Sequence, residues 1–316
     1  MANGYNLCVV GCGTMGVAIL SGVLDSLAHP SVESSSRNGA AETPDSSAIL
    51  DPQADSSPAN FVTTVNREES IKRLNKVWRE TVKNSELHVD VVAGDNVGPV
   101  SRSDVILLCC KPQMAQSILQ VPGMSEALAG KLVISILAGT RLEQLHSWLP
   151  SDTRVIRAMP NTPCKIREGM TVISNVPTGP NARLDRAILS SLFTPIGRVR
   201  FLDEKYFDAC TALSGSGPAF ACLMLEAMAD GGVMMGLPRS EALELAAQTM
   251  QGAARMVLKS GAHPAAIKDS VTTPGGCTIA GLLTLEDGRV RSTIARCIQT
   301  ATEHASGLGQ ATTGKR

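Results

Sequence analysis

The sequence predicts an α/β protein in which an N-terminal doubly wound parallel sheet is followed by an all-helical C-terminal region. Up to about residue 203, short apolar runs with β-branched residues alternate with helical patterns, which is typical of a parallel sheet with helices on both faces. From 204 to 316 the apolar spacing is helical throughout. We therefore predict two domains, 1–203 and 204–316, as a length of 316 residues also favours.

Charge and composition exclude several classes of partner. The 29 basic and 29 acidic residues balance, so nothing favours nucleic acid or an anionic membrane surface. The nine cysteines contain no CxxC pair, so neither a disulfide framework nor a metal site is predicted. The longest apolar region, 209–225, contains Ser-Gly-Ser-Gly-Pro and makes a poor membrane span. The first strand begins by about Leu7, too early for a secretory leader, so we expect a cytoplasmic protein acting on a small molecule.

The segment Tyr5–Gly16 predicts a strand, a tight turn and the start of a helix. Its turn, Gly11-Cys12-Gly13-Thr14-Met15-Gly16, matches the GxGxxG pattern of Rossmann-type dinucleotide-binding folds. Glycine at 11 and 13 allows a sharp turn that lies close to a pyrophosphate, and Gly16 lets the helix pack on the strand. The free amides at the start of the helix then face the anion. The alternative is an ordinary tight turn without a ligand.

The segment Ser31–Pro58 is rich in Ser, Pro, Ala and Asp and contains almost no large apolar residue. Such a composition cannot offset the entropy of ordering the chain, so we predict a disordered surface insertion. The next strand is predicted at Asn60–Val65, followed by a helix at Ile71–Val82.

Asn66 and Arg67 follow that second strand, where a fold that binds NAD usually has an acidic residue. An arginine attracts the 2′-phosphate that an aspartate would repel, so the pair favours NADPH over NADH. Glu68 and Glu69 weaken this interpretation, and NADH remains an alternative donor. In a second interpretation, the segment Asn66–Ser70 only caps the following helix.

Four more strands are predicted, and each ends in a loop with Gly, Pro, Asn or Lys. Ligands of doubly wound folds lie at the carboxyl ends of the strands, so four such loops along one edge favour a binding site. A further strand, helix and strand complete the sheet. The four strands are predicted at Val89–Ala93, Asp104–Cys110, Leu132–Ala138 and Arg154–Ala158. The last three elements are the strand Met170–Ser174, the helix Asn181–Phe193 and the strand Gly197–Leu202.

The helical half is unusually apolar for its size. The helix predicted at Ala219–Met235 is apolar on nearly all faces, broken only by Glu226 and Asp230, which indicates burial on every side. Further helices are predicted from Pro238 to about Lys259, at Thr278–Leu285 and at Arg289–Ala305. Because a small domain cannot cover so much apolar surface alone, we expect an intertwined homodimer.

Three stretches of this half are more specific than a generic dinucleotide-binding pattern: Leu213–Phe220 (LSGSGPAF), Asp230–Pro238 (DGGVMMGLP) and Val271–Thr278 (VTTPGGCT). With the glycine turn, Lys111-Pro112 and Met159–Pro163 (MPNTP), they resemble the pyrroline-5-carboxylate reductase family over the whole chain except the insertion. The resemblance implies reduction of the C=N bond of 1-pyrroline-5-carboxylate by NADPH, giving L-proline in the last step of proline biosynthesis. It also implies a homodimer, with a larger ring of dimers left open.

The resemblance also implies roles for single residues. The glycine turn would bind the pyrophosphate, Asn66 and Arg67 the 2′-phosphate, and Asn96 the adenosine side. Residues after the fourth and fifth strands would border the ribose and nicotinamide: Cys109, Cys110, Lys111, Pro112, Leu137 and Ala138. Substrate contacts would come from Thr273, Gly275, Gly276, Cys277 and Thr278, with Glu204 a weaker candidate. Cys277 stands where the family more often has alanine.

The chemistry of the reaction suits these residue types. The turn Pro274–Gly276 precedes a helix, so free amides can bind a carboxylate without arginine. The Thr278 hydroxyl can orient the imine nitrogen and relay a proton from water, which suffices because an imine is partly protonated near neutral pH. Alternatively, Thr278 is only a helix N-cap, and Lys111 only a solvated turn residue. Ser214 and Ser216 favour close packing of a partner helix over lining a pocket.

Two other functions are weighed against this one. A related NAD(P)-dependent oxidoreductase acting on a 3-hydroxy or 2-keto acid would need a strong acid, yet none of the five histidines falls in a motif loop. A dinucleotide-sensing dimer without turnover would not need Thr278 and the glycine turns, which are intact.

Overall fold

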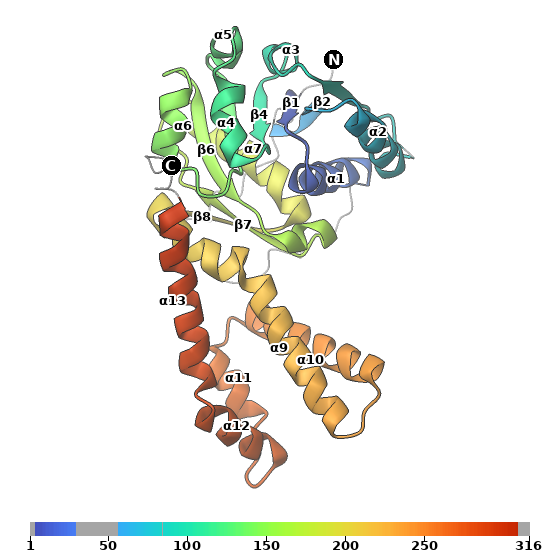
Figure 1. Ribbon diagram of the computed structural model, residues 1–316, viewed down its shortest axis with the longest axis vertical. Coiled ribbons are helices and arrows are strands. Elements are labelled where there is room, and N and C mark those ends of the chain that lie inside the picture. The colour runs from blue at the N-terminus through green and yellow to red at the C-terminus, as the bar shows by residue number, and fades with distance from the viewer. Residues whose placement is uncertain (1–3, 30–55, 84, 309–316) are drawn as a thin grey trace, which may run out of the picture. The chain divides into compact units, whose positions relative to one another are not determined.

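The computed structural model describes residues 4–29, 56–83 and 85–308 (Figure 1). These fall into two compact units. The first comprises the described residues up to Thr211 together with 304–308, and the second comprises 212–303. The division thus follows Thr211, a little beyond the boundary expected at 203.

The first unit contains an eight-stranded sheet in the order β3-β2-β1-β4-β5-β6-β7-β8. Neighbouring strands are parallel except for β6 and β7, which are antiparallel. The prediction of an all-parallel sheet is therefore wrong at this pair. Only a short 3-10 segment, Thr162–Ile166 (η3), joins the two strands, whereas a parallel connection needs a crossover of a dozen or more residues. The strands are Tyr5–Val10 (β1), Pro58–Val65 (β2), Val89–Ala93 (β3), Val105–Leu108 (β4), Leu132–Ser135 (β5), Arg154–Met159 (β6), Gly169–Ser174 (β7) and Gly197–Leu202 (β8).

Two hydrophobic clusters cover the two faces of this sheet. Side chains alternate between them along β1, with Leu7 and Val9 in one cluster and Cys8 and Val10 in the other. Helices α1, α2 and α7 contribute to the first cluster, and α3 to α6 contribute to the second. The predicted doubly wound architecture is thus confirmed. The helices are Thr14–Ala28 (α1), Glu69–Thr81 (α2), Val97–Ser101 (α3), Pro112–Leu119 (α4), Met124–Leu128 (α5), Leu142–Trp148 (α6) and Ala182–Phe193 (α7).

The predicted insertion Ser31–Pro58 ends earlier than expected. Pro58 is the first residue of β2, and the buried Ser56 accepts a hydrogen bond of 2.7 Å from the Ser191 hydroxyl through its carbonyl oxygen. The prediction of disorder is therefore wrong for the end of the segment, because pairing with β1 and the contact to α7 order these polar residues. The rest of the insertion lies outside the described residues.

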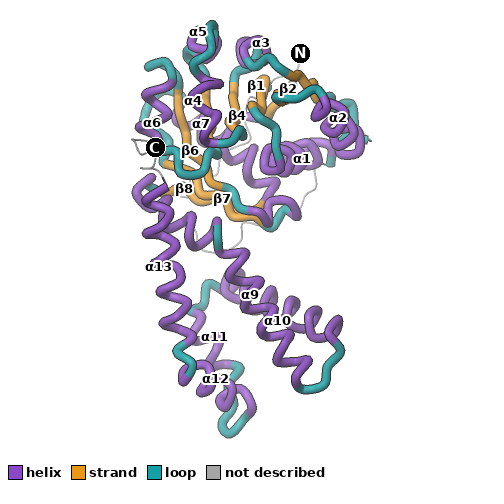
Figure 2. The backbone as a smooth tube through the Cα atoms, in the orientation of Figure 1, coloured by secondary structure: helices purple, strands orange, loops and turns teal. Residues whose placement is uncertain are grey.

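The second unit is helical, as predicted (Figure 2). The short segments Glu204–Tyr206 (η5) and Phe207–Cys210 (α8) precede it, and the π-helical Thr211–Gly215 (η6) contains the boundary after Thr211. Helices α9 and α10 pack through small residues, since a Cβ on Gly232 would lie 3.2 Å from that of Ala242. The longer helices are Gly217–Met234 (α9), Arg239–Ser260 (α10), Pro264–Ser270 (α11), Cys277–Asp287 (α12) and Val290–Leu308 (α13).

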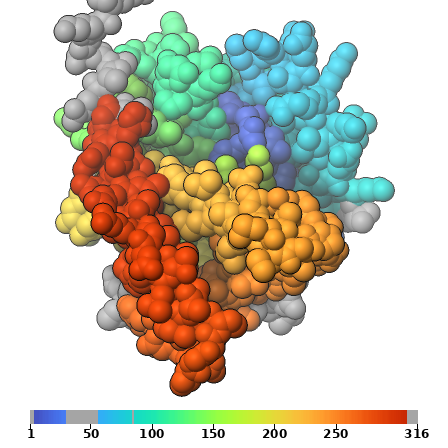
Figure 3. Space-filling view, turned by 60° about the horizontal axis from the view of Figure 1, so that its bottom comes forward, coloured from blue at the N-terminus to red at the C-terminus, as the bar shows by residue number. Residues whose placement is uncertain are grey.

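The expected burial of the apolar helix is not seen within one chain. Leu223 is 66% exposed, Met234 81% and Met235 79%. The described residues hold one helical stretch, Glu204–Met234, that is long and apolar enough to cross a membrane by length and composition alone. The prediction that its Ser-Gly-Ser-Gly-Pro motif makes a poor span thus fails by this measure, because the motif continues the helix through η6 into α9. Helices α10 and α13 also lie at the surface in Figure 3.

Candidate functional site

The glycine turn lies between β1 and α1, and packing dictates two of its three glycines. Gly11 has a φ of +78°, and a Cβ there would lie 2.7 Å from Cα of Cys110. A Cβ on Gly16 would lie 3.3 Å from side-chain atoms of Val9 and Cys109. At Gly13 the nearest described atom to such a Cβ is the Gly11 oxygen, 3.9 Å away. Gly11 thus permits the turn, Gly16 permits helix-to-strand packing, and Gly13 leaves space for a ligand.

The start of α1 is free to receive an anion. Gly13 occupies the N-cap position, no described side chain caps this end, and its first turn has no acidic residue. The amides of the first turn and the positive end of the helix dipole therefore face the space beside Gly13 and Thr14, both of which are exposed. Met15 is half-buried. Burial raises the pKa of the Cys12 thiol to about 12, so Cys12 offers the turn its backbone rather than a charged sulfur.

The turn is attached to β2 through Thr64. The carbonyl oxygen of Thr64 accepts hydrogen bonds from the amides of Gly11 (3.1 Å) and Cys12 (3.0 Å). The Thr64 hydroxyl donates to Oδ1 of Asn96 at 2.6 Å. The structure thus places Asn96 beside the glycine turn, and its contact with the adenosine side stays a prediction.

Asn66 and Arg67 are exposed directly after β2. They do not cap α2, because this helix begins at Glu69 with Glu68 at the N-cap position and shows no capping by a described side chain. The segment Asn66–Ser70 thus contains the N-cap position, but no capping by one of its side chains is seen. The exposed guanidinium of Arg67 stays available for a phosphate.

The loops after β4 and β5 carry the remaining predicted cofactor residues. Both strands end earlier than predicted, at Leu108 and Ser135, so these residues belong to loops. Cys109 and Cys110 are half-buried, and burial raises both pKa values, that of Cys110 to about 11. Exposed Lys111 is the N-cap residue of α4 and Pro112 begins that helix. After β5, Leu137 is buried and Ala138 is exposed.

Glu204 belongs to the first unit, where two donors hold its carboxylate. The amide of Leu142 donates to Oε1 at 2.8 Å, and the Arg157 guanidinium donates to the same oxygen at 3.0 Å. Arg157 is buried, and its guanidinium lies 4.7 Å from the centre of the Phe207 ring. These contacts give Glu204 a fixed position, and its contact with substrate stays a prediction.

The turn Thr273-Pro274-Gly275-Gly276 precedes α12 in the second unit. The Gly276 amide donates to the Thr273 oxygen at 3.1 Å, and Gly275 has a φ of +69°. Proline second and a left-handed glycine third are the signature of a type II turn. A Cβ on Gly276 would lie 2.5 Å from Oγ1 of Thr273 and 3.2 Å from its carbonyl oxygen, so a larger residue at the fourth position would displace the Thr273 side chain.

The helix N-terminus that follows this turn has free backbone amides. Helix α12 begins at Cys277 with Gly276 as its N-cap residue, so no side chain in the described structure caps it. Thr278 is the second helical residue, and the alternative that it serves as the N-cap is therefore wrong. Between 271 and 279 the sequence has no Asp, Glu, His, Lys or Arg, which leaves backbone amides and hydroxyls, among them those of exposed Thr273 and half-buried Thr278, to bind an anion.

The structure thus gathers the predicted site residues into two groups. The glycine turn, Asn96, Cys109 and Cys110 come together in the first unit, and Thr273 with 275–278 form one turn in the second. No cluster of three or more His, Cys, Asp or Glu suited to a metal occurs within the described ranges.

Comparison with known proteins identifies the family. Residues 204–308 match the family model described as pyrroline-5-carboxylate reductase dimerisation, and residues 6–139 match the model described as NADP oxidoreductase, coenzyme F420-dependent. A Schizosaccharomyces pombe protein named pyrroline-5-carboxylate reductase is 49% identical over 304 residues, covering 96% of this chain and 99% of its own. The chain belongs to the pyrroline-5-carboxylate reductase family.

Other proteins of this family are similar to the chain over nearly its whole length. A reductase of this name from Lophium arboricola is 45% identical over 98% of the chain and 94% of its own length. The crystal structure of Plasmodium falciparum pyrroline carboxylate reductase with NADP bound has a TM-score of 0.71 and 26% sequence identity. It covers 98% of this chain and 99% of its own.

Sequence reasoning missed two polar residues of this reductase. Thr64 joins the glycine turn to Asn96, and Arg157 holds Glu204. Both had a readable signal, because a polar or charged side chain in the middle of a buried strand needs a partner.

Proposed function

We propose that this reductase uses NADPH to convert 1-pyrroline-5-carboxylate to L-proline by hydride transfer to the C=N carbon, the last step of proline biosynthesis. NADH is an alternative donor. The observation that carries the proposal is the turn Thr273–Gly276, which opens α12 with free amides and without any ionisable side chain except the Cys277 thiol. Such a site suits a small carboxylate whose reduction needs no strong acid.

The first unit fits a dinucleotide. The open space at Gly13 and the amides of the first turn of α1 suit a pyrophosphate, which a side chain at position 13 would obstruct. Arg67 and Asn66 would hold the 2′-phosphate that distinguishes NADPH, and Asn96 would contact the adenosine side. When bound, the nicotinamide supplies the hydride.

The second unit supplies the substrate groups. The amides of Gly276, Cys277 and Thr278 would bind the carboxylate together with the positive end of the α12 dipole. The Thr278 hydroxyl would accept a hydrogen bond from the protonated imine or pass it a proton from water. Because the imine is itself basic, this weak acid is sufficient. A 2-keto acid would instead require a strong acid, which the turn lacks.

An assay of NADPH oxidation tests the reaction. We expect turnover with 1-pyrroline-5-carboxylate and none with pyruvate, and no reduction of NADP⁺ by 3-hydroxyisobutyrate. Turnover confined to either of the other two substrates would favour the related oxidoreductases. Binding of NADPH without turnover of any substrate would favour a dinucleotide-sensing protein.

We also infer that two copies pair through the helical region. Leu223, Met234 and Met235 are mostly exposed in the single chain, and the segment 204–308 matches a dimerisation model. Burial of these side chains against a second copy would remove a large apolar area from water. Light scattering at micromolar concentration without detergent should give the mass of a dimer. A monomeric mass, or a requirement for detergent, would contradict this inference. A larger ring and a cytoplasmic location stay predictions.

A further inference from the structure

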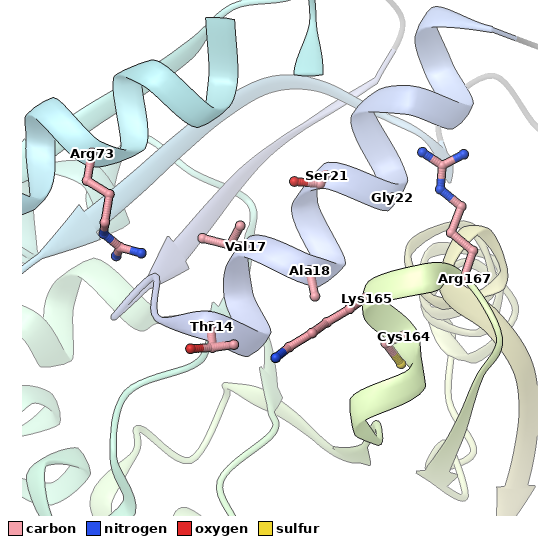
Figure 4. Close-up of a pocket in the computed structure, with 9 residues that line it drawn as sticks. All are labelled: Thr14, Val17, Ala18, Ser21, Gly22, Arg73, Cys164, Lys165 and Arg167. Carbon is pink, nitrogen blue, oxygen red and sulfur yellow. The ribbon is translucent and has the colours of Figure 1, made fainter. Parts of the chain in front are cut away.

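An open groove of about 340 Å³ runs along α1 in the first unit (Figure 4). Helix α1 supplies one wall, α2 contributes Arg73, and the segment around η3 contributes the opposite side. Its lining contains three cationic side chains and no carboxylate. The lining residues are Thr14, Val17, Ala18, Ser21, Gly22, Arg73, Cys164, Lys165 and Arg167.

Two of these cations are available to a ligand. Arg167 forms an ion pair with Asp25 of α1, whereas Arg73 and Lys165 have no ion-pair partner among the described residues. In Figure 4, Arg73 and Lys165 extend from opposite sides toward the half of α1 that contains Thr14. Arg167 lies toward the other end, near Gly22.

The same half of α1 adds its own donors. Thr14 is the first residue of the helix, so the open amides of the first turn and the positive end of the dipole act on this end of the groove. The hydroxyl of Thr14 is a further donor on the wall at this end. The exposed guanidinium of Arg73, the exposed ammonium of Lys165 and the helix amides at this end of the groove form a set of donors that suits a phosphate group.

We propose that the groove binds a phosphate group between Arg73 and Lys165, two residues that the family resemblance does not assign to the cofactor. The phosphate belongs either to the dinucleotide itself or to a second phosphorylated small molecule. In the first case the inference rests on the proposed use of NADPH. The apolar wall at Val17 and Ala18 would contact the carbon part of that molecule.

Calorimetric titration of the full chain tests the proposal. Wild type, Arg73→Gln and Lys165→Gln are titrated with NADPH, with NADH, and with inorganic phosphate before and after saturation with NADPH. Arg79→Gln is the matched control, because it removes the same charge from an exposed position of α2 outside the groove. Arg73→Lys and Lys165→Arg keep the charge and should restore binding.

We expect each Gln variant to bind at least one of the titrated ligands about tenfold more weakly than wild type does, which is the order of magnitude for losing a charge-assisted hydrogen bond. Loss of NADPH affinity alone identifies the 2′-phosphate, and equal loss of NADPH and NADH affinity identifies the pyrophosphate. Loss of inorganic phosphate binding to the NADPH-saturated protein identifies a separate ligand. If every affinity in both Gln variants stays within about twofold of Arg79→Gln, the proposal is overturned. These titrations measure binding and need no turnover. If the protein did not reduce pyrroline-5-carboxylate, the proposed function would be overturned, but the phosphate-binding proposal would still be decided by the titrations.

Discussion

The hydroxyl of Thr64 donates a hydrogen bond of 2.6 Å to Oδ1 of Asn96, across the carboxyl edge of the sheet. The carbonyl of the same threonine accepts from the amides of Gly11 and Cys12. One buried residue thus connects the glycine turn with a residue assigned to the adenosine side. Its carbonyl is the shorter-range acceptor for the turn, and its side chain orients Asn96 and also accepts a longer hydrogen bond of 3.4 Å from the Gly11 amide.

This division of roles predicts the effect of Thr64→Val. The substitution keeps the carbonyl and the shape of the side chain but removes the donor to Asn96. We expect the Kd of NADPH to rise about five- to tenfold, the effect of losing one hydrogen bond of 1–1.5 kcal/mol. Fluorescence titration measures it, and Thr64→Ser, which keeps the hydroxyl, should bind as the wild type does. An unchanged Kd in the valine variant would show that Asn96 does not need this partner.

The first two glycines of the turn should respond differently to alanine. Gly11→Ala places a Cβ 2.7 Å from Cα of Cys110 at a φ of +78°, so we expect a lower Tm, with a loss of stability of roughly 1–3 kcal/mol. Gly13→Ala meets no described atom nearer than 3.9 Å and has a φ of −84°. It should therefore keep the wild-type Tm but weaken NADPH binding. Circular dichroism measures the Tm of both variants, and titration measures their affinity for NADPH. A Tm that falls as much in Gly13→Ala as in Gly11→Ala would contradict this prediction.

The sequence was sufficient for most of the fold because local signals and burial agree there. The runs at β1, β4 and β5 pack on both faces of the sheet and therefore read clearly as strands. It failed at two strands. The direction of β7 follows from the shortness of the η3 connection, and Pro58 joins β2 through pairing with β1 that its polar neighbours do not signal.

The same limit applies to the site. The glycine turn and the Thr273–Gly276 turn were predictable, because proline and glycine set their backbone conformations. The alternative of Thr278 as an N-cap failed because capping preference does not tell which residue begins a helix, and Gly276 takes the N-cap position. The groove beside α1 was not predictable, because Arg73 and Lys165 are far apart in the chain and only the fold brings them to one helix.

Stability should decrease at alkaline pH through Cys12. Burial raises the pKa of this thiol from 9.0 to about 12, so the folded protein keeps the proton that the unfolded chain loses above pH 9. The unfolded state binds fewer protons in this window, so the free energy of unfolding falls as pH rises, by about 1.4 kcal/mol per pH unit for one thiol. Urea unfolding at pH 7 and pH 10 measures the decrease. In Cys12→Ala it should be smaller by about 1.4 kcal/mol, and equal decreases in the two proteins would contradict the assignment.

Thr278→Ala tests the proposed chemistry most directly. Because Gly276 and not Thr278 occupies the N-cap position, the substitution removes a hydroxyl without removing a cap, and the Tm should stay close to that of the wild type. If the hydroxyl orients the imine and relays its proton, kcat should fall by the equivalent of about 2–4 kcal/mol of transition-state stabilisation. The KM for NADPH should change little, since Thr278 is assigned to the substrate.

Thr278→Ser separates this role from packing of the threonine methyl group. The serine keeps the donor and acceptor and should retain most of the wild-type kcat, whereas a packing role would make serine and alanine equally poor. Steady-state kinetics at saturating NADPH, with circular dichroism to check folding, distinguish the two. A decrease in kcat below about twofold in the alanine variant would remove Thr278 from the mechanism, because losing a hydrogen bond formed in the transition state costs far more.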